Sequence, residues 1–334
     1  MFCGQPELKE ELGPLEKGMN RRIVFMGTPA FAVPTLEALA SSQFRVAAVY
    51  TQPDRPSGRG RKLVASPVKE FAISRDIPVY QPESLRPQVV QDRLTVLSPD
   101  VIVVAAYGLI LPRTVLAIPT FGALNIHPSL LPRHRGPSPI ANALLEGDDV
   151  TGVTIMLVRP RVDSGPVLSS RKLRIGPEDT TGSLTNDLAP MGAGLLMETL
   201  SPWLDGRVQP GPQDEALATY SRMISKGDAE IDWRLPALQI WRQVRAFHPW
   251  PGAGTLWRGK RLKVLKSEPI SEGPEARPGE VVQWKNRNGG MTLAVGTGEG
   301  LLGLCRVQLE GRRETYAESF ALGYRDFVGA LLPS

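Results

Sequence analysis

The sequence predicts an α/β protein of two domains, a Rossmann-like domain with a mostly parallel sheet followed by a smaller OB-like β-barrel domain. Three observations predict this arrangement. Apolar runs alternate with helix-compatible segments over residues 21–204, which is typical of βαβ units. A stretch rich in Gly, Pro, Gln and acids follows at 205–220, as in linkers between domains. Within 221–334, five short strands separated by glycines indicate a small barrel.

Length and composition set the class of protein. With 334 residues, 42% of them hydrophobic, the chain is long enough for two cores. Its two cysteines, Cys3 and Cys305, lie far apart, which argues against a disulfide framework or a cysteine metal site and favours a reducing compartment. We therefore expect a cytoplasmic protein. No apolar run approaches the ~20 residues of a membrane span.

The first twenty residues carry four acids and two lysines without an apolar core. They resemble neither a signal peptide nor a transit peptide. We expect 1–20 to be a disordered leader, with Met19 an equally plausible start.

The first elements form a βαβ unit. An apolar run at 22–26 is closed by Gly-Thr-Pro, a helical pattern occupies 34–40, and a second apolar run occupies 44–50. The turn sequence GTPAFA lacks the G-x-G-x-x-G fingerprint of dinucleotide sites. A nicotinamide dehydrogenase is therefore a weak alternative.

A basic segment rich in glycine and proline follows at 51–67. Over 54–69, five bases face one acid, a local balance of +4, and the whole chain has a net charge of +5 and a pI near 9.3. We expect a mobile loop with no sheet element, in which the bases reach a polyanion and the glycines let the backbone approach it. A solvated insertion is the alternative.

The remaining elements follow from the same patterns. In the first domain they are helices at 68–75, 87–97, 139–146 and 184–200 and strands at 78–80, 101–106, 122–126, 151–157 and 167–172. In the second domain a helix at 236–247 precedes strands at 255–257, 260–266, 279–284, 291–295 and 301–309. The apolar loop at 107–112 either packs in the core or forms the wall of a slot for a flat aromatic ligand.

The stretch LNIHPSLLPRHRGPSPI at 124–140 carries the candidate chemistry. Asn125 and His127 lie two residues apart at the end of an apolar run, so on a strand both side chains leave on the same side. Four prolines and Gly136 then enforce a rigid loop. Loops at the carboxyl ends of strands are where open α/β sheets bind ligands.

Asn125, His127 and a carboxylate suit acyl transfer to an amine. An amide donates to the oxygen of a tetrahedral intermediate, an imidazole moves a proton near neutral pH, and a carboxylate orients the ring. Asp163 lies in the turn VDSG between two expected strands, where it either serves the turn or supplies that carboxylate. No cysteine has a neighbouring His and no G-x-S-x-G is present, so covalent catalysis is not expected. His134 and His248 lack metal-ligand spacing, and we expect surface or packing roles and no metal.

These motifs resemble the formyltetrahydrofolate-dependent formyltransferases: Asn125-Ile-His127, then SLLP at 129–132, Gly136, and VDSG. The resemblance implies that Asn125 binds the formyl oxygen, His127 assists proton transfer and charge stabilisation, and Asp163 orients His127 and a relay water. It implies 10-formyltetrahydrofolate as cosubstrate. The implied folate-binding residues are Tyr107, Gly108, Leu109, Ile110, Leu111, Ser129, Leu130, Leu131, Pro132, Val158 and Val162.

Further stretches are similar to the branch of that family that formylates methionine on initiator tRNA. They are IVFMGTPAFAVPTL, TQPDRPSGRGRKLVASPVK, VVAAYGLILP, VTIML, IDW and RAFHPWPGA. The resemblance implies that the basic segment enters the tRNA acceptor end, with Arg59 the foremost contact. The implied nucleic-acid-binding residues are Arg59, Arg61, Lys62, Lys69 and Lys226. We expect a monomer with initiator Met-tRNA as partner; a formyltransferase acting on a sugar-nucleotide amine and a non-catalytic tRNA-binding protein are the alternatives.

Overall fold

The computed structural model describes residues 21–57, 62–270, 272–285 and 290–334. The expected leader at 1–20 lies outside these ranges. The chain divides into two compact units. The first unit holds the residues up to Pro132, Val153–Arg171 and Leu188–Ala216, and the second holds Arg133–Gly152, Lys172–Asp187 and Leu217–Ser334. The division of the sequence at 205–220 stays a prediction. Across the described ranges, no helix has the length and apolar character needed to cross a membrane.

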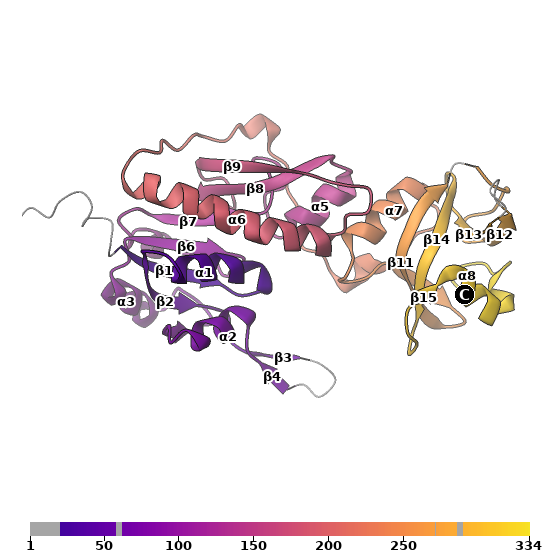
Figure 1. Cartoon of the computed structure of the whole chain (residues 1–334), viewed down its shortest axis with the longest axis horizontal. Helices are drawn as coiled ribbons and strands as arrows, with labels where there is room; N and C mark the ends of the chain where they lie inside the picture. The colour runs from indigo at the N-terminus through magenta and orange to yellow at the C-terminus, as the bar shows by residue number, and fades with distance from the viewer. Residues whose placement is uncertain (1–20, 58–61, 271, 286–289) are drawn as a thin grey trace, which may run out of the picture. The chain divides into compact units, whose positions relative to one another are not determined.

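A mostly parallel sheet of seven strands, in the order β5-β2-β1-β6-β7-β8-β9, forms the scaffold of the site (Figure 1). The strands are β1 (Arg22–Gly27), β2 (Arg45–Tyr50), β5 (Val79–Tyr80), β6 (Val101–Ala105), β7 (Ala123–His127), β8 (Val150–Leu157) and β9 (Val167–Arg174). β1 pairs in parallel with β2 and β6, and β7 pairs in parallel with β6, whereas β8 runs antiparallel to β7. The predicted Rossmann-like sheet is confirmed.

Burial explains why these strands read as unbroken apolar runs. Every residue of β6 is buried, and so are five of the six residues of β1. A parallel strand covered on both faces needs apolar side chains in both directions. The helices of this part of the chain are α1 (Val33–Ala40), α2 (Pro67–Ser74), α3 (Gln88–Leu97), α4 (Arg113–Leu116), α5 (Pro139–Glu146) and α6 (Thr181–Leu204), with a 3-10 turn η1 (Ala30–Ala32).

The basic segment contains a β-hairpin, so the expectation of a loop without a sheet element was wrong. β3 (Arg55–Ser57) pairs antiparallel with β4 (Lys62–Val64) (Figure 1). In this pairing Arg55 lies opposite Val64. The apolar pair Leu63 and Val64 favours extended backbone. Residues 58–61 lie outside the described ranges.

The second unit contains the predicted antiparallel β domain. Its sheet has the order β10-β11-β14-β13-β12, and β15 pairs with β14. The elements are α7 (Ala237–Ala246), β10 (Gly254–Trp257), β11 (Lys260–Ile270), β12 (Val281–Lys285), β13 (Met291–Gly296), β14 (Leu301–Leu309), β15 (Thr315–Tyr316) and α8 (Ala317–Gly323), with 3-10 turns η2 (Glu215–Leu217), η3 (Lys226–Ala229) and η4 (Arg325–Phe327). Trp257 anchors the core, with ring centroids of Phe320, Tyr324 and Phe327 at 5.2–5.4 Å.

Candidate active site

Strand β7 carries Asn125 and His127 on the same face. Asn125 lies opposite Val104 of β6 and Met156 of β8, and His127 lies opposite Thr154 of β8. Ile126, between them, packs against α6: a Cβ on Gly192 would lie 2.7 Å from Ile126 Cγ2. Side chains alternate along a strand, so Asn125 and His127 leave β7 on the face opposite α6.

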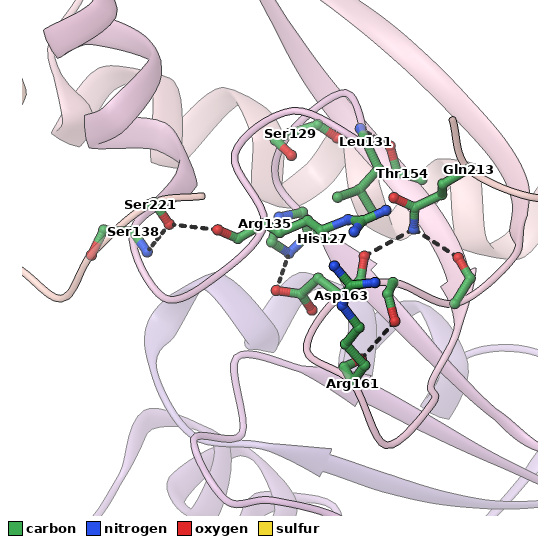
Figure 2. A network of polar contacts seen from close by, with 12 residues as sticks. His127, Ser129, Leu131, Arg135, Ser138, Thr154, Arg161, Asp163, Gln213 and Ser221 are labelled. Carbon is green, nitrogen blue, oxygen red and sulfur yellow. Dashed lines mark hydrogen bonds and ion pairs between the residues drawn. The ribbon is translucent and has the colours of Figure 1, made fainter. Parts of the chain in front are cut away.

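Asp163 reaches His127 from the turn after β8. Its Oδ2 lies 3.7 Å from His127 Nδ1, and the two side chains are 17% and 5% exposed (Figure 2). This separation is an ion-pair distance and is too long for a direct hydrogen bond. Because both groups are largely withdrawn from water, salt screens their interaction weakly. The structure therefore brings together the two side chains that the sequence placed in separate motifs.

The backbone of Asp163 is in the left-handed region, with φ +46°. A residue with a Cβ is uncommon there, although Asp tolerates the conformation better than most. The turn is fixed against β8, because a Cβ on Gly165 would lie 1.7 Å from the Leu157 carbonyl oxygen. In addition, the Leu157 amide donates to the Pro166 carbonyl at 2.9 Å. The unusual conformation of Asp163 is thus imposed by its surroundings.

Thr154 ties the loop after His127 to the sheet. Its hydroxyl donates to the Ser129 carbonyl at 2.7 Å and accepts from the Leu131 amide at 3.2 Å (Figure 2). Thr154 and Ser129 are fully buried. Thr154 was not among the predicted site residues; the signal for it in the sequence is the lone hydroxyl in the apolar run VTIML.

The later part of that loop belongs to the second unit and is held by hydrogen bonds to the buried His134. His134 Nε2 donates to Asp148 Oδ2 at 2.7 Å, and Asn142 Nδ2 donates to His134 Nδ1 at 2.9 Å. Of the two roles expected for His134, surface or packing, its burial agrees with packing.

Arg135 in the same loop is also fully buried. It is bridged to the segment around Ser221, whose hydroxyl donates to the Arg135 carbonyl at 3.2 Å (Figure 2). These contacts anchor the backbone that follows the cis Leu131-Pro132 peptide.

In the expected folate-binding segment at 107–111, the first and last side chains pack in the core and are not available to a ligand. The side chains of Tyr107 and Leu111 are buried in the core of the first unit, whereas Ile110 is 76% exposed. The Tyr107 carbonyl accepts from Thr28 Oγ1 at 3.1 Å and from Gln52 Nε2 at 2.9 Å. Burial raises the pKa of the Tyr107 hydroxyl. The Tyr107 ring therefore belongs to the core, and any wall that this segment offers a ligand consists of its backbone and its later side chains.

The other expected folate-binding residues lie at varying depth. Leu130, Leu131, Pro132 and Val158 are partly buried, and Val162 is exposed beside Asp163. Gly108 has φ +81°, and a Cβ there would lie 2.2 Å from Gln52 Nε2. Glycine is needed at this position both for its backbone conformation and for the close approach of Gln52.

The expected tRNA-binding bases fall into three groups. Arg59 and Arg61 lie outside the described residues, and Lys62 is described only as backbone of β4. Lys69 Nζ lies 2.6 Å from Asp54 Oδ2, so its ammonium is engaged within the chain. Lys226 is exposed at the start of η3.

The Lys69 contact braces the base of the hairpin. Gln81 Nε2 also donates to Asp54, at 2.7 Å. The hydrogen bonds from Lys69 and Gln81 lower the pKa of the Asp54 carboxyl. Lys69 thus joins the start of α2 to the residue just before β3.

An amide and an imidazole on β7 and a carboxylate from the turn after β8 can act on a carbonyl group and an amine together. Asn125 can donate to an oxygen that gains negative charge, and His127 can accept a proton while Asp163 stabilises its charged form. No serine or cysteine nucleophile takes part in this arrangement of described residues. The geometry suits direct transfer of an acyl group to an amine.

Comparison with known proteins agrees with this chemistry. A family model described as Formyl transferase matches residues 21–200, and one described as Formyl transferase, C-terminal domain, matches residues 223–325. The methionyl-tRNA formyltransferase of Roseiflexus sp. (strain RS-1) is 48% identical over 309 residues, which cover 92% of this chain and 94% of that protein.

Two solved structures share the fold. The N-formyltransferase from Helicobacter canadensis, solved with folinic acid and dTDP-3-aminofucose, matches with a TM-score of 0.61 and 15% identity over 88% of this chain and 100% of that one. HypX from Aquifex aeolicus, solved with tetrahydrofolic acid, matches with a TM-score of 0.58 and 18% identity. That match covers 92% of this chain and spans 48% of HypX.

Proposed function

The chain belongs to the formyl transferase family, among the methionyl-tRNA formyltransferases, and from this premise we propose that Asn125, His127 and Asp163 move a formyl group from 10-formyltetrahydrofolate to the α-amine of methionine on initiator tRNA. The product is formyl-Met-tRNA for the start of translation. The observation that carries the assignment is the 3.7 Å approach of Asp163 Oδ2 to His127 Nδ1 beside Asn125 on β7.

The reaction proceeds by direct attack. The lone pair of the methionine amine forms a bond to the formyl carbon, and the electrons of the carbonyl double bond move to its oxygen. Asn125 donates a hydrogen bond to that oxygen, where preorganised donors are typically the largest catalytic contribution. The electron pair on the oxygen then re-forms the carbonyl as the bond between the formyl carbon and N10 of the folate breaks, and the electron pair of that bond passes to N10.

His127 and Asp163 manage the protons. The attacking nitrogen loses one proton, through His127 or a water held by Asp163, and N10 gains one, so the transfer is neutral overall. Asp163 is close enough to stabilise the protonated imidazole during this step. The imidazole must be held in a fixed position, because a general base can take a proton only when it lies within hydrogen-bond distance of the group that carries it.

The two substrates use different parts of the chain. We assign the folate to the backbone and exposed side chains around 107–111, 129–132, Val158 and Val162. We assign tRNA binding to Arg59, Arg61, Lys62 and Lys226. Lys69 contributes indirectly, because its ion pair with Asp54 holds the start of the hairpin. We propose that the protein acts in the cytoplasm as a monomer. A sugar-nucleotide amine is the second candidate substrate class, because a structural neighbour bears that ligand.

The assignment is tested with His127→Ala and Asp163→Ala. We expect kcat to fall by about 10²-fold or more in each variant, because general acid–base catalysis typically contributes 10²–10⁴-fold. Binding of initiator Met-tRNA, measured by filter retention, should stay within about twofold of wild type, since neither side chain is assigned to tRNA. Near wild-type turnover in both variants would exclude the proposed roles.

Substrate class is tested by offering the wild-type enzyme initiator Met-tRNA, elongator Met-tRNA, uncharged tRNA and a dTDP-amino sugar, each with 10-formyltetrahydrofolate. We expect formylation of initiator Met-tRNA above all others. Preferential formylation of the amino sugar would support the second candidate instead.

A further inference from the structure

The segment expected to be a simple linker packs against the turn that carries Asp163. Gly211 and Val167 exchange two backbone hydrogen bonds of 2.9 and 2.8 Å, as in an antiparallel bridge. Arg161 Nη1 lies 3.1 Å from Glu215 Oε2. Residues 211–215 therefore run alongside 161–167, and all of these residues belong to the first unit.

Gln213 makes the central contact between these two segments. Its side-chain Nε2 donates to the Asp163 carbonyl at 2.8 Å and to the Gly165 carbonyl at 2.7 Å (Figure 2). An amide nitrogen has two protons, so both are used on the backbone of this turn. The two carbonyls belong to the catalytic carboxylate's own residue and to the second residue after it.

These contacts matter because the Asp163 backbone does not adopt its conformation by preference. Its φ of +46° lies in the left-handed region, which is unfavourable for a residue with a Cβ. Gly165 pressed against Leu157 fixes the turn from the sheet side, and Gln213 fixes it from the linker side. The direction of the Asp163 side chain toward His127 follows from this backbone conformation.

The neighbouring ion pair cannot replace Gln213. Arg161 and Glu215 are 62% and 53% exposed, and exposed pairs contribute little to stability. The Gly211 bridge holds Val167, beyond the turn itself. Of these three contacts between the linker and the turn, the Gln213 hydrogen bond is made to Asp163 itself.

We propose that Gln213 is a positioning residue for formyl transfer, which holds the Asp163 turn so that the carboxylate faces His127. The proposal rests on the function proposed above. It gives the segment at 205–220 a role in the chemical step as well as in connecting the two predicted domains.

The test compares Gln213→Glu and Gln213→Ala with matched controls. The first variant keeps the size of the side chain and removes both donors, and the second removes the side chain. Gln209→Glu and Gln209→Ala change the same residue type in the same linker, where Gln209 is exposed and lies outside the Asp163 turn. Gln213→Asn keeps the donors on a shorter side chain and serves as the conservative variant.

We expect Gln213→Glu and Gln213→Ala to lower kcat by about 10- to 100-fold, since a displacement of about 1 Å at a catalytic group can cost 10²-fold. KM for 10-formyltetrahydrofolate and for Met-tRNA should stay within about twofold of wild type, because Gln213 is not assigned to binding either substrate. The Gln209 variants should match wild type, and Gln213→Asn should recover part of kcat. In an Asp163→Ala background, Gln213→Ala should cause no additional loss, because the group that it positions is gone.

The outcomes separate the inference from the proposed function. If Asp163→Ala is impaired while Gln213→Glu keeps wild-type kcat, the positioning role of Gln213 is overturned and the function stands. A loss that scales with the unfolded fraction in thermal melts, or one that is fully additive with Asp163→Ala, also overturns it. If Asp163→Ala itself keeps wild-type kcat, the proposed function fails first.

Discussion

At the scale of single residues, the site depends on polar side chains that hold backbone in place. Asn125 and His127 need no such help to share a face, because the strand itself directs them. The loop and the turn that complete the site are irregular, and their backbone groups find partners in side chains. Thr154 serves the loop after His127, as Gln213 serves the Asp163 turn.

Removing the hydroxyl of Thr154 should loosen the catalytic loop. Thr154→Val keeps the shape of the side chain but leaves the Ser129 carbonyl and the Leu131 amide without this partner. A buried unsatisfied group costs about 1–3 kcal/mol, so we expect a loss of that size in the free energy of unfolding, measured by chemical denaturation. Formyl transfer should slow as well, because His127 immediately precedes this loop.

Thr151 on the same strand provides a matched control for this prediction. It is buried, and its hydroxyl has no hydrogen-bond partner among the described residues. Thr151→Val should therefore be neutral or stabilising. Equal destabilisation by the two substitutions would mean that the Thr154 hydrogen bonds do not add to the free energy of unfolding.

At the scale of elements, side-chain contacts from helix α2 and from Gln81 hold the start of the β3–β4 hairpin in place. The side chain of Ser66 caps α2 by accepting from the Lys69 amide, and Pro67 occupies the first turn. Lys69 and Gln81 then hold Asp54, just before β3. The basic segment that we assign to tRNA is therefore held in place at the residue that precedes β3.

The Asp54 contact predicts a pH-dependent contribution to stability. The pKa of Asp54 is lowered in the folded chain, so the stabilisation is present above the unfolded pKa of ~3.9 and is lost as pH falls through the lower folded pKa. We expect Lys69→Met to reduce the free energy of unfolding at pH 7, and this difference from wild type to shrink as pH falls below ~4.

Urea titrations at several pH values measure this difference. Lys260→Met is the control, because Lys260 is an exposed lysine on β11, away from Asp54 in the sequence. It should show no such pH trend. A Lys69→Met effect that is constant from pH 7 to pH 3 would contradict the assigned ion pair.

At the scale of the whole molecule, the residues proposed for the chemistry and those proposed for substrate selection come from different parts of the chain. The proposed catalytic set lies on β7 and the turn after β8, whereas the basic segment and Lys226 carry the charges that we assign to tRNA. A net charge of +5 agrees with a polyanionic substrate. Substitutions in the two regions should therefore have distinguishable kinetic effects.

Arg59→Ala should raise KM for Met-tRNA and lower kcat, while KM for the folate stays unchanged. Lys226→Ala should weaken tRNA binding and reduce the slope of log K against log salt by about 1, as expected for loss of one phosphate contact. Arg86→Ala, at an exposed arginine outside the basic segment, is the control and should leave both values unchanged. A change confined to folate affinity in Arg59→Ala would show that the hairpin serves the other substrate.

Much of the fold followed from local patterns. Continuous apolar runs identified β1, β2, β6 and β7, and the period of two placed Asn125 and His127 on one face. The short elements α4, β15 and α8 were missed, because two to seven residues carry too little periodic signal. The β3–β4 hairpin was missed because its glycines, prolines and charges suggested a loop, while antiparallel pairing across the segment decided its structure.

The order of the elements and the residue types of the proposed catalytic set could be predicted from the sequence, because both depend on neighbours along the chain. The tertiary structure decided how closely Asp163 approaches His127 and which groups hold the Asp163 turn. Asp163, Thr154 and Gln213 each act on a segment far from them in the chain. Such contacts depend on strand register and on the path of a linker across the sheet, and no local pattern in the sequence encodes them.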